Sequence, residues 1–385
     1  MSILENKEGQ PCYTIYNGFI KVYITIQGGH LTAIFNQNGE DIDPFFYAPW
    51  SAEAKQEKVD WILHVLRGDP FCLPFGSGKD TYQGKKYPHH GKTANDLWDF
   101  IALENQGNKK KLKLSMRLDD NEGEVEKLIT LSDNSPLVYD QHSIKNFFGK
   151  TSLGHHHTFH LPYHENSAII DFSEPIAGFS TPIPAYHPRE GEGIETGYSW
   201  IQHNQEISDL RRIQCIDGSF MDFSRFPIPK GYAEIILFIS NPKLDFCYSA
   251  ISVPEKGFCY FQLKDPEILS STMFWISNGG QYNFPSQRKV DSILALEEVT
   301  GYFHFGRKKS VANNPLIERG YKTYLSINEQ LKVNMIYGVF PISKGFKGIK
   351  NIIKKDNQTI QVIGKQGEKV DIPCFIDFLH QGYFD

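Results

Sequence analysis

Four segments that lie far apart in the chain carry the side chains best suited to chemistry. In chain order they are Arg67 to Gly76, His89-His90-Gly91 with Trp98 downstream, Gly154 to Pro162 with His156 near its centre, and Leu296 to Thr300. Histidine has an unperturbed pKa of about 6.5, and burial raises the pKa of a carboxylate toward neutrality. The planar guanidinium of arginine can orient hydroxyl groups. Together these residue types predict general acid–base chemistry on a sugar.

The segment Leu294–Thr300 offers two adjacent carboxylates, and strand geometry separates them. Side chains alternate between the two faces of a strand. Leu294, Leu296 and Glu298 therefore share the apolar face, and Glu297 lies on the other. We expect Glu297, rather than Glu298, to reach a site outside the core.

The same alternation divides the histidine run. His156 and His160 share one face of an extended segment, and His155 and His157 share the other. His155-x-His157 also resembles the His-x-His of cupin sandwiches, but Leu161 and Pro162 stand where that motif needs a carboxylate. We therefore expect no metal ligands and no cofactor. A metal-dependent enzyme acting on sugars through this run, with zinc or non-haem iron, is the less favoured alternative.

Composition restricts the class of protein. The chain has 385 residues, 28 Phe and 19 Tyr, and this wealth of aromatics favours β-structure. A net charge of −5 argues against nucleic acid as the main partner. The six cysteines form no CxxC pair, which indicates free thiols in a reducing compartment. The N-terminus lacks the pattern of a signal peptide and no apolar run is long enough for a membrane helix, so we expect a cytoplasmic location without membrane contact.

Strand signals dominate the chain. Polar and apolar residues alternate over 111–118, a turn follows, and 125–131 can return antiparallel. Further strands are expected at 19–26, 31–35, 232–240, 257–263, 323–337 and 359–364. The best helix candidate is Ala52–Leu66, and Thr181–Gly197 is expected to be a long loop. No linker interrupts the pattern, so a single domain over residues 1–385 is predicted.

Five segments also carry a family resemblance. They are Arg67–Gly76, His90-Gly91 with Trp98, His156–Pro162, Trp275–Gly280 and Leu294–Thr300. In this order, over roughly residues 20 to 310, they resemble a divergent branch of the aldose 1-epimerase (galactose mutarotase-like) superfamily. The resemblance implies an all-β fold, a large antiparallel β-sandwich with a sugar-binding groove across one sheet.

The resemblance also implies roles for individual residues. Glu297 would be the general base at the anomeric hydroxyl and His156 the general acid at the ring oxygen. His90 would polarise the substrate near that oxygen, and Arg67 would hold sugar hydroxyls. The remaining candidates for substrate binding are Trp98, His160 and Trp275, although the two tryptophans are better suited to packing than to stacking on a sugar.

The activity implied is interconversion of the α and β anomers of a hexose or a derivative, without a metal or an organic cofactor. The ligand would be a small carbohydrate, and the sequence leaves the oligomeric state open. A non-catalytic carbohydrate-binding protein on the same fold is the main alternative, because fold alone does not fix function.

Overall fold

The computed structural model describes residues 3–51, 59–119, 122–133, 135–182, 199–281 and 285–384. Strands account for 52% of the chain and helices for 7%, which confirms the predicted all-β class. Each segment expected to be a strand contains one. Of the helix predicted over 52–66, the described part holds only α1 (Trp61–Val65), and residues 52–58 lie outside the described residues. The loop predicted over 181–197 falls outside them from residue 183 onward.

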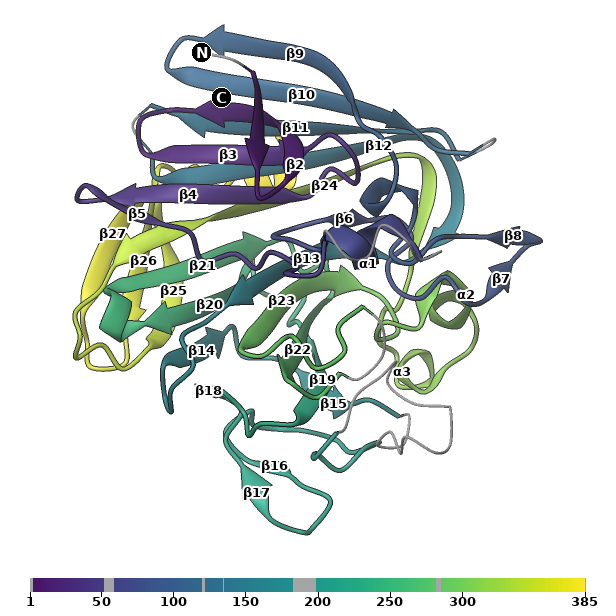
Figure 1. Cartoon of the computed structure of the whole chain (residues 1–385), viewed down its shortest axis with the longest axis vertical. Coiled ribbons are helices and arrows are strands. Elements are labelled where there is room, and N and C mark those ends of the chain that lie inside the picture. Colours follow the sequence, from purple (N-terminus) through teal and green to yellow (C-terminus); the bar gives the residue numbers. More distant parts are fainter. Residues whose placement is uncertain are drawn as a thin grey trace.

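Two large antiparallel sheets form the body of the described structure (Figure 1). The nine-stranded sheet has the order β18 (Arg225–Phe226), β14 (Ala168–Phe172), β20 (Cys247–Val253), β21 (Phe258–Lys264), β24 (Leu325–Pro341), β12 (Leu137–Thr151), β11 (Glu124–Ser132), β10 (Lys109–Arg117) and β9 (Asp99–Gln106). The six-stranded sheet has the order β15 (Ala177–Ser180), β19 (Tyr232–Ile239), β22 (Ser271–Asn278), β23 (Ile293–Thr300), β13 (Leu153–His160) and β6 (Phe71–Cys72).

Smaller elements surround these two sheets. An N-terminal sheet contains β1 (Leu4–Lys7), β2 (Gln10–Tyr16), β3 (Ile20–Thr25), β4 (Leu31–Gln37) and β5 (Glu40–Ile42). A C-terminal sheet contains β25 (Ile349–Asp356), β26 (Thr359–Gly364) and β27 (Lys369–Pro373). Two hairpins and three short helices complete the set: β7 (Thr81–Tyr82) with β8 (Lys85–Lys86), β16 (Ile213–Gln214) with β17 (Phe220–Met221), α2 (Gly306–Val311), α3 (Pro315–Glu318) and α4 (Phe378–Gln381).

The main core lies between the two large sheets. It takes Val138 from β12 and Met335 from β24 on one side, and Phe159 from β13 and Leu296 from β23 on the other. A second apolar cluster, which includes Met273 and Val299, covers the outer face of the six-stranded sheet. Strands β13 and β23 therefore have both faces buried, and each face can hold its own set of polar side chains. That the whole chain forms one domain stays a prediction.

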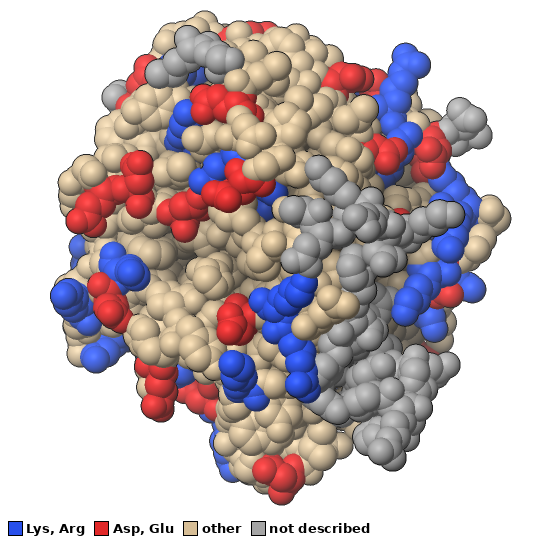
Figure 2. Space-filling model, viewed as in Figure 1, with Lys and Arg blue, Asp and Glu red and all other residues tan. Residues whose placement is uncertain are grey.

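The structure also bears on the cysteines, on membrane spans and on surface charge. All six cysteines are free and buried, as predicted. None of the helices in the described ranges has both the length and the apolar character that a membrane span requires. On the face shown in Figure 2, basic and acidic side chains are interspersed, with no large basic area.

Candidate active site

The centre of the candidate site is a histidine–carboxylate pair on two neighbouring strands. β13 and β23 run antiparallel in a register that places His156 directly opposite Glu297. Their side chains point to the outer face of the six-stranded sheet, and His156 Nε2 lies 3.5 Å from Glu297 Oε1. His156 is 6% exposed and Glu297 is 1% exposed. Two residues 141 positions apart in sequence are thus brought together by strand pairing alone.

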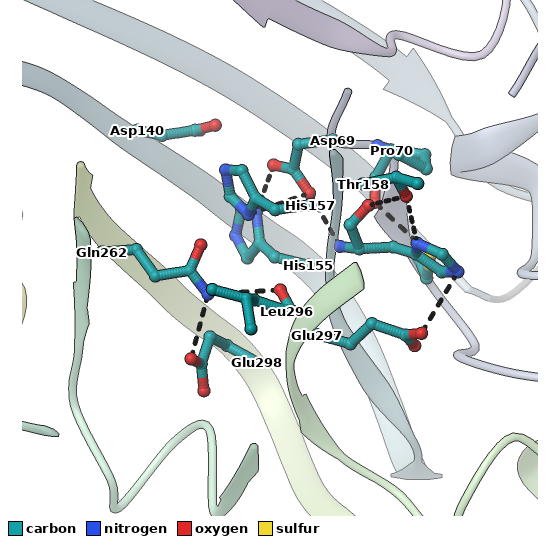
Figure 3. Close-up of polar contacts among 12 residues, drawn as sticks. Asp69, Pro70, Asp140, His155, His157, Thr158, Gln262, Leu296, Glu297 and Glu298 are labelled. Carbon is teal, nitrogen blue, oxygen red and sulfur yellow. Dashed lines mark hydrogen bonds and ion pairs between the residues drawn. The ribbon is translucent and has the colours of Figure 1, made fainter. Parts of the chain in front are cut away.

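Glu298 occupies the opposite face of β23, as alternation predicted. Its carboxylate pairs with the Lys264 ammonium inside the sandwich. It also accepts hydrogen bonds from Ser249 Oγ at 2.6 Å and from Gln262 Nε2 at 2.9 Å. Figure 3 shows Glu297 and Glu298 pointing away from each other. The structure therefore leaves Glu297 as the carboxylate that faces His156.

The charge state of the pair follows from burial. Desolvation raises the pKa of Glu297 well above its usual range, and its Oε2 has no hydrogen-bond partner among the described residues. Burial also lowers the pKa of His156 to about 4. Burial therefore favours the neutral form of both groups, with a proton on the carboxyl group of Glu297 and none on His156 Nε2.

Thr158 sets the tautomer of His156. The Thr158 hydroxyl donates to the His156 backbone carbonyl at 3.1 Å, so it is left to accept a hydrogen bond from the ring. His156 Nδ1 lies 3.0 Å from that hydroxyl oxygen and must carry the proton it donates. The Nε2 lone pair then faces Glu297, which gives the site a proton acceptor beside a proton donor.

Aromatic rings border the pair. The His90 ring meets the His156 ring edge-on, with 5.0 Å between centroids, and Trp275 approaches His156 at 5.9 Å. The His90 ring also packs edge-on against Phe75 and His89, with ring centroids 4.9 Å and 4.3 Å apart. The structure thus brings together four predicted site residues: Glu297, His156, His90 and Trp275. Their roles stay predictions.

Arg67 is not brought to this pair. Its side chain is buried, and its guanidinium donates to the backbone carbonyls of Lys7 at 2.7 Å, Glu8 at 3.1 Å and Val65 at 3.2 Å. All three nitrogens of the fork are therefore occupied, and the two terminal ones anchor the β1–β2 hairpin. Arg67 does not pair with its near neighbour Asp69 either, because Asp69 bonds to His155.

Trp98 and His160 also lie apart from the pair. Trp98 is 1% exposed and its indole donates to the Thr93 carbonyl at 3.0 Å, so its ring packs in the core instead of presenting a face to a sugar. His160 shares the face of His156 but is exposed at the end of β13. Four residues along a strand correspond to about 13 Å, beyond contact with the pair.

A surface pocket reaches the edge of the site. It has a volume of about 510 Å³, and its wall includes His89, which packs on His90. Lys79 and Lys86 also line it. Two other lysines of this region are already in ion pairs, since Lys85 contacts Glu122 and Lys92 contacts Asp119. The pocket provides a position for a polar ligand next to the histidines.

Sequence reasoning missed three kinds of residue. Thr158 and His89 support the site residues and lie within segments named from sequence, but neither was assigned a role. A third group lies inside the sandwich, where Asp140 and His142 of β12 are fully buried with His155 of β13. The signal for this group was available, because two polar residues spaced i, i+2 in a strand as apolar as β12 must share one face.

No protein-family model and no curated protein matches the sequence. Solved structures match over most of the chain. A candidate aldose 1-epimerase from Klebsiella pneumoniae has 13% identity and a TM-score of 0.56, with 89% of this chain and 83% of that chain covered. A galactose mutarotase related enzyme from Lactobacillus acidophilus has 14% identity and a TM-score of 0.51, covering 86% and 98%. A galactose mutarotase-like protein from Clostridium acetobutylicum has 12% identity and a TM-score of 0.50, covering 88% and 98%.

These likenesses establish the fold. The described sheets form a galactose mutarotase-like β-sandwich, and the resemblance stated from sequence is confirmed at that level. At 12 to 14% identity, the activity of the neighbours does not transfer to this chain.

Proposed function

We propose that this protein is an aldose 1-epimerase that interconverts the α and β anomers of a hexose or a hexose derivative. The observation that carries the proposal is the approach of His156 Nε2 to within 3.5 Å of Glu297 Oε1 across paired strands. A proton acceptor and a proton donor held this close can act on two oxygens of one sugar ring.

The reaction needs one proton removed and one proton added. A base takes the proton of the anomeric hydroxyl, the bond between C1 and the ring oxygen breaks, and an acid protonates that oxygen. Rotation about C1–C2 and ring closure on the other carbonyl face then reverse both transfers. Glu297 as base and His156 as acid need a carboxylate beside an imidazolium. That state contains the same number of protons as the neutral pair, so one transfer from Glu297 to His156 Nε2 prepares the site.

His90 and Trp275 have supporting roles in this proposal. His90 Nδ1 accepts the Gly76 amide at 3.3 Å, which leaves its Nε2 to donate a hydrogen bond to a sugar oxygen. Trp275 is half-buried beside His156 and can pack against the apolar face of the ring. Neither Arg67 nor Trp98 is needed.

The experiment that tests the proposal is saturation transfer between anomeric protons, measured by NMR with a panel of aldohexoses and their 6-phosphates. Acceleration of exchange by the purified protein, lost in Glu297→Gln, supports the assignment. Binding of a sugar without any acceleration across the panel would overturn it. That result would favour the alternative, a carbohydrate-binding protein that uses the same face of the sheet.

A further inference from the structure

A second group of ionisable side chains lies inside the sandwich, behind the face that carries His156. Asp140 and His142 come from β12, and His155 comes from β13. All three are fully buried, and one ligand atom from each lies within 4.8 Å of the other two. Figure 3 shows Asp140 and His155 on the opposite side of the strands from the Glu297 carboxylate.

These three residues have five polar side-chain atoms without a hydrogen-bond partner in the described part of the chain. They are both carboxylate oxygens of Asp140, both ring nitrogens of His142 and Nε2 of His155. Asp140 Oδ1 and His142 Nδ1 are 3.3 Å apart, but they are not aligned as a hydrogen bond. Buried polar groups almost always have a hydrogen-bond partner or a ligand. Here the described protein atoms supply none, so we expect a bound species shared by the three residues.

We propose that Asp140, His142 and His155 bind a divalent transition-metal ion of the zinc class. Two imidazole nitrogens and one carboxylate oxygen are a donor set that zinc accepts. Ligand atoms at about 2.0–2.2 Å from a tetrahedral ion are separated from each other by about 3.3–3.5 Å. The 3.3 Å between Asp140 Oδ1 and His142 Nδ1 fits two neighbouring ligands of one ion.

Asp69 prepares His155 for this role. Asp69 Oδ2 lies 2.7 Å from His155 Nδ1 and accepts its proton, which leaves the lone pair on Nε2 of His155, an atom without a hydrogen-bond partner among the described residues. Metal-binding histidines characteristically donate their second nitrogen to a carboxylate in this way. Asp69 Oδ1 accepts the backbone amide of His156 at 2.7 Å. Asp69 is therefore a positioning residue with both oxygens occupied.

The second possible ligand set is less suitable. Asp69, His155 and His157 meet the same distance limit. However, both oxygens of Asp69 already accept hydrogen bonds, and His157 Nδ1 is 3.6 Å from Asp69 without being bonded to it. The set with Asp140 has free lone pairs on every member.

The local charge also favours a cation. The charged groups that face the cluster are the carboxyl groups of Asp69 and Asp140 and the ammonium of Lys127, which donates to the Gly29 carbonyl at 2.6 Å. With neutral imidazoles, two carboxylates and one ammonium leave a net charge of −1. This net charge favours a bound cation, which would accept a lone pair from each of the three residues at once.

The location predicts a structural role. β12 belongs to the nine-stranded sheet and β13 to the six-stranded sheet. An ion bound between them would connect the two layers of the sandwich, in a closed position away from the outer face of β13.

Metal content of the full-length protein tests the proposal. The protein, free of any polyhistidine tag, is expressed in zinc-supplemented medium and dialysed. Mass spectrometry of its Mn, Fe, Co, Ni, Cu and Zn is expected to find about one equivalent of a single transition metal per chain. His142→Gln and Asp140→Asn are expected to lose this metal, and Asp69→Asn to weaken its retention roughly 10- to 100-fold.

A matched control is available in the same region. His164 is exposed and pairs with Glu255, so His164→Gln makes the same chemical change on the surface and is expected to keep the metal. Less than about a tenth of an equivalent in the unmutated protein would overturn the proposal. Loss of the metal in His157→Gln together with its retention in His142→Gln would also overturn the proposal, because the ligands would then be Asp69, His155 and His157. If the variants do not fold, X-ray absorption spectroscopy of the cobalt-substituted unmutated protein tests the proposal. A number of imidazole ligands other than two would contradict the assignment.

Discussion

Glu297 and Glu298 are neighbours in one strand, equally buried, and opposite in almost every chemical respect. Burial raises the pKa of Glu297 well above its usual range, and no charged partner opposes that effect. The pKa of Glu298 is lowered although desolvation acts on it as well, because Lys264, Ser249 and Gln262 stabilise its charge. A strand with both faces buried thus favours the neutral form of one carboxyl group and the charged form of its neighbour.

The two faces of β23 therefore carry different kinds of group, one available for reaction and one that stabilises the fold. Glu297 faces an imidazole at 3.5 Å, and one of its oxygens is unpartnered among the described residues. Glu298 is bonded on both oxygens, to Ser249 and Gln262 through Oε1 and to Thr272 through Oε2. An unpartnered group can bind a ligand or transfer a proton, whereas a fully bonded group is fixed. Each prediction below tests this contrast.

The largest effect is expected for Glu297→Gln. Loss of a general acid–base group should slow anomer exchange by about 10²- to 10⁴-fold. The free energy of unfolding at neutral pH should rise, because Gln is neutral at every pH whereas Glu297 loses stability as pH rises above the ordinary pKa of Glu. NMR saturation transfer and urea denaturation measure the two quantities. Full activity in this variant would remove Glu297 from the mechanism.

Glu298→Gln should show the reverse pattern. Removing one member of a buried ion pair leaves the Lys264 charge uncompensated and typically reduces stability by about 3–5 kcal/mol. Exchange catalysis, measured well below the melting temperature, should remain. The double variant Glu298→Gln with Lys264→Met should recover part of the lost stability, and a failure to recover any would contradict the ion-pair explanation.

The pH dependence of stability should have opposite signs at the two positions. The raised pKa of Glu297 stabilises the fold below the ordinary pKa of Glu, and this contribution is lost as pH rises through the folded-state pKa. The lowered pKa of Glu298 stabilises the fold above the ordinary value and is lost as pH falls through the folded-state pKa. Each slope is about 1.4 kcal/mol per pH unit within its interval. Urea titrations of the unmutated protein and of each Gln variant from pH 3 to 8 measure the two pH dependences. Slopes of the same sign for the two positions would contradict the contrast.

The smallest effect is expected for Thr158→Val. This change removes the acceptor for His156 Nδ1 but keeps the shape of the side chain, and one hydrogen bond contributes about 1 kcal/mol. Anomer exchange should slow about fivefold, since 1.4 kcal/mol corresponds to tenfold. Thr158→Ser keeps the hydroxyl and serves as the control. A loss as large as that of Glu297→Gln would mean that Thr158 does more than orient the ring.

The sequence predicted the strands and the separation of Glu297 from Glu298 because both depend on period-two alternation. Leu294 and Leu296 mark the core face of β23, and Glu297 must then leave it. The order of motifs along the chain was enough to predict the fold, which the solved structures confirm.

Other features of the site depend on contacts that a sequence does not contain. Arg67 sits in a segment that looks like a ligand-binding one, but the backbone carbonyls of Lys7 and Glu8 take its donors. That interaction depends on how the N-terminal hairpin folds back, which no local pattern specifies. The shared face of Asp140 and His142 follows from their spacing, but their closeness to His155 does not, because His155 belongs to the other sheet.

The hydrogen bond from the His156 amide to Asp69 Oδ1 has a consequence for redesign of this fold. Two faces that share no side chains are connected here through one main-chain group and one carboxylate. An engineer who alters the interior at Asp69 will therefore also move the backbone that carries His156. Residue 156 can be substituted to introduce new chemistry, whereas Asp69 has to be retained in any redesign.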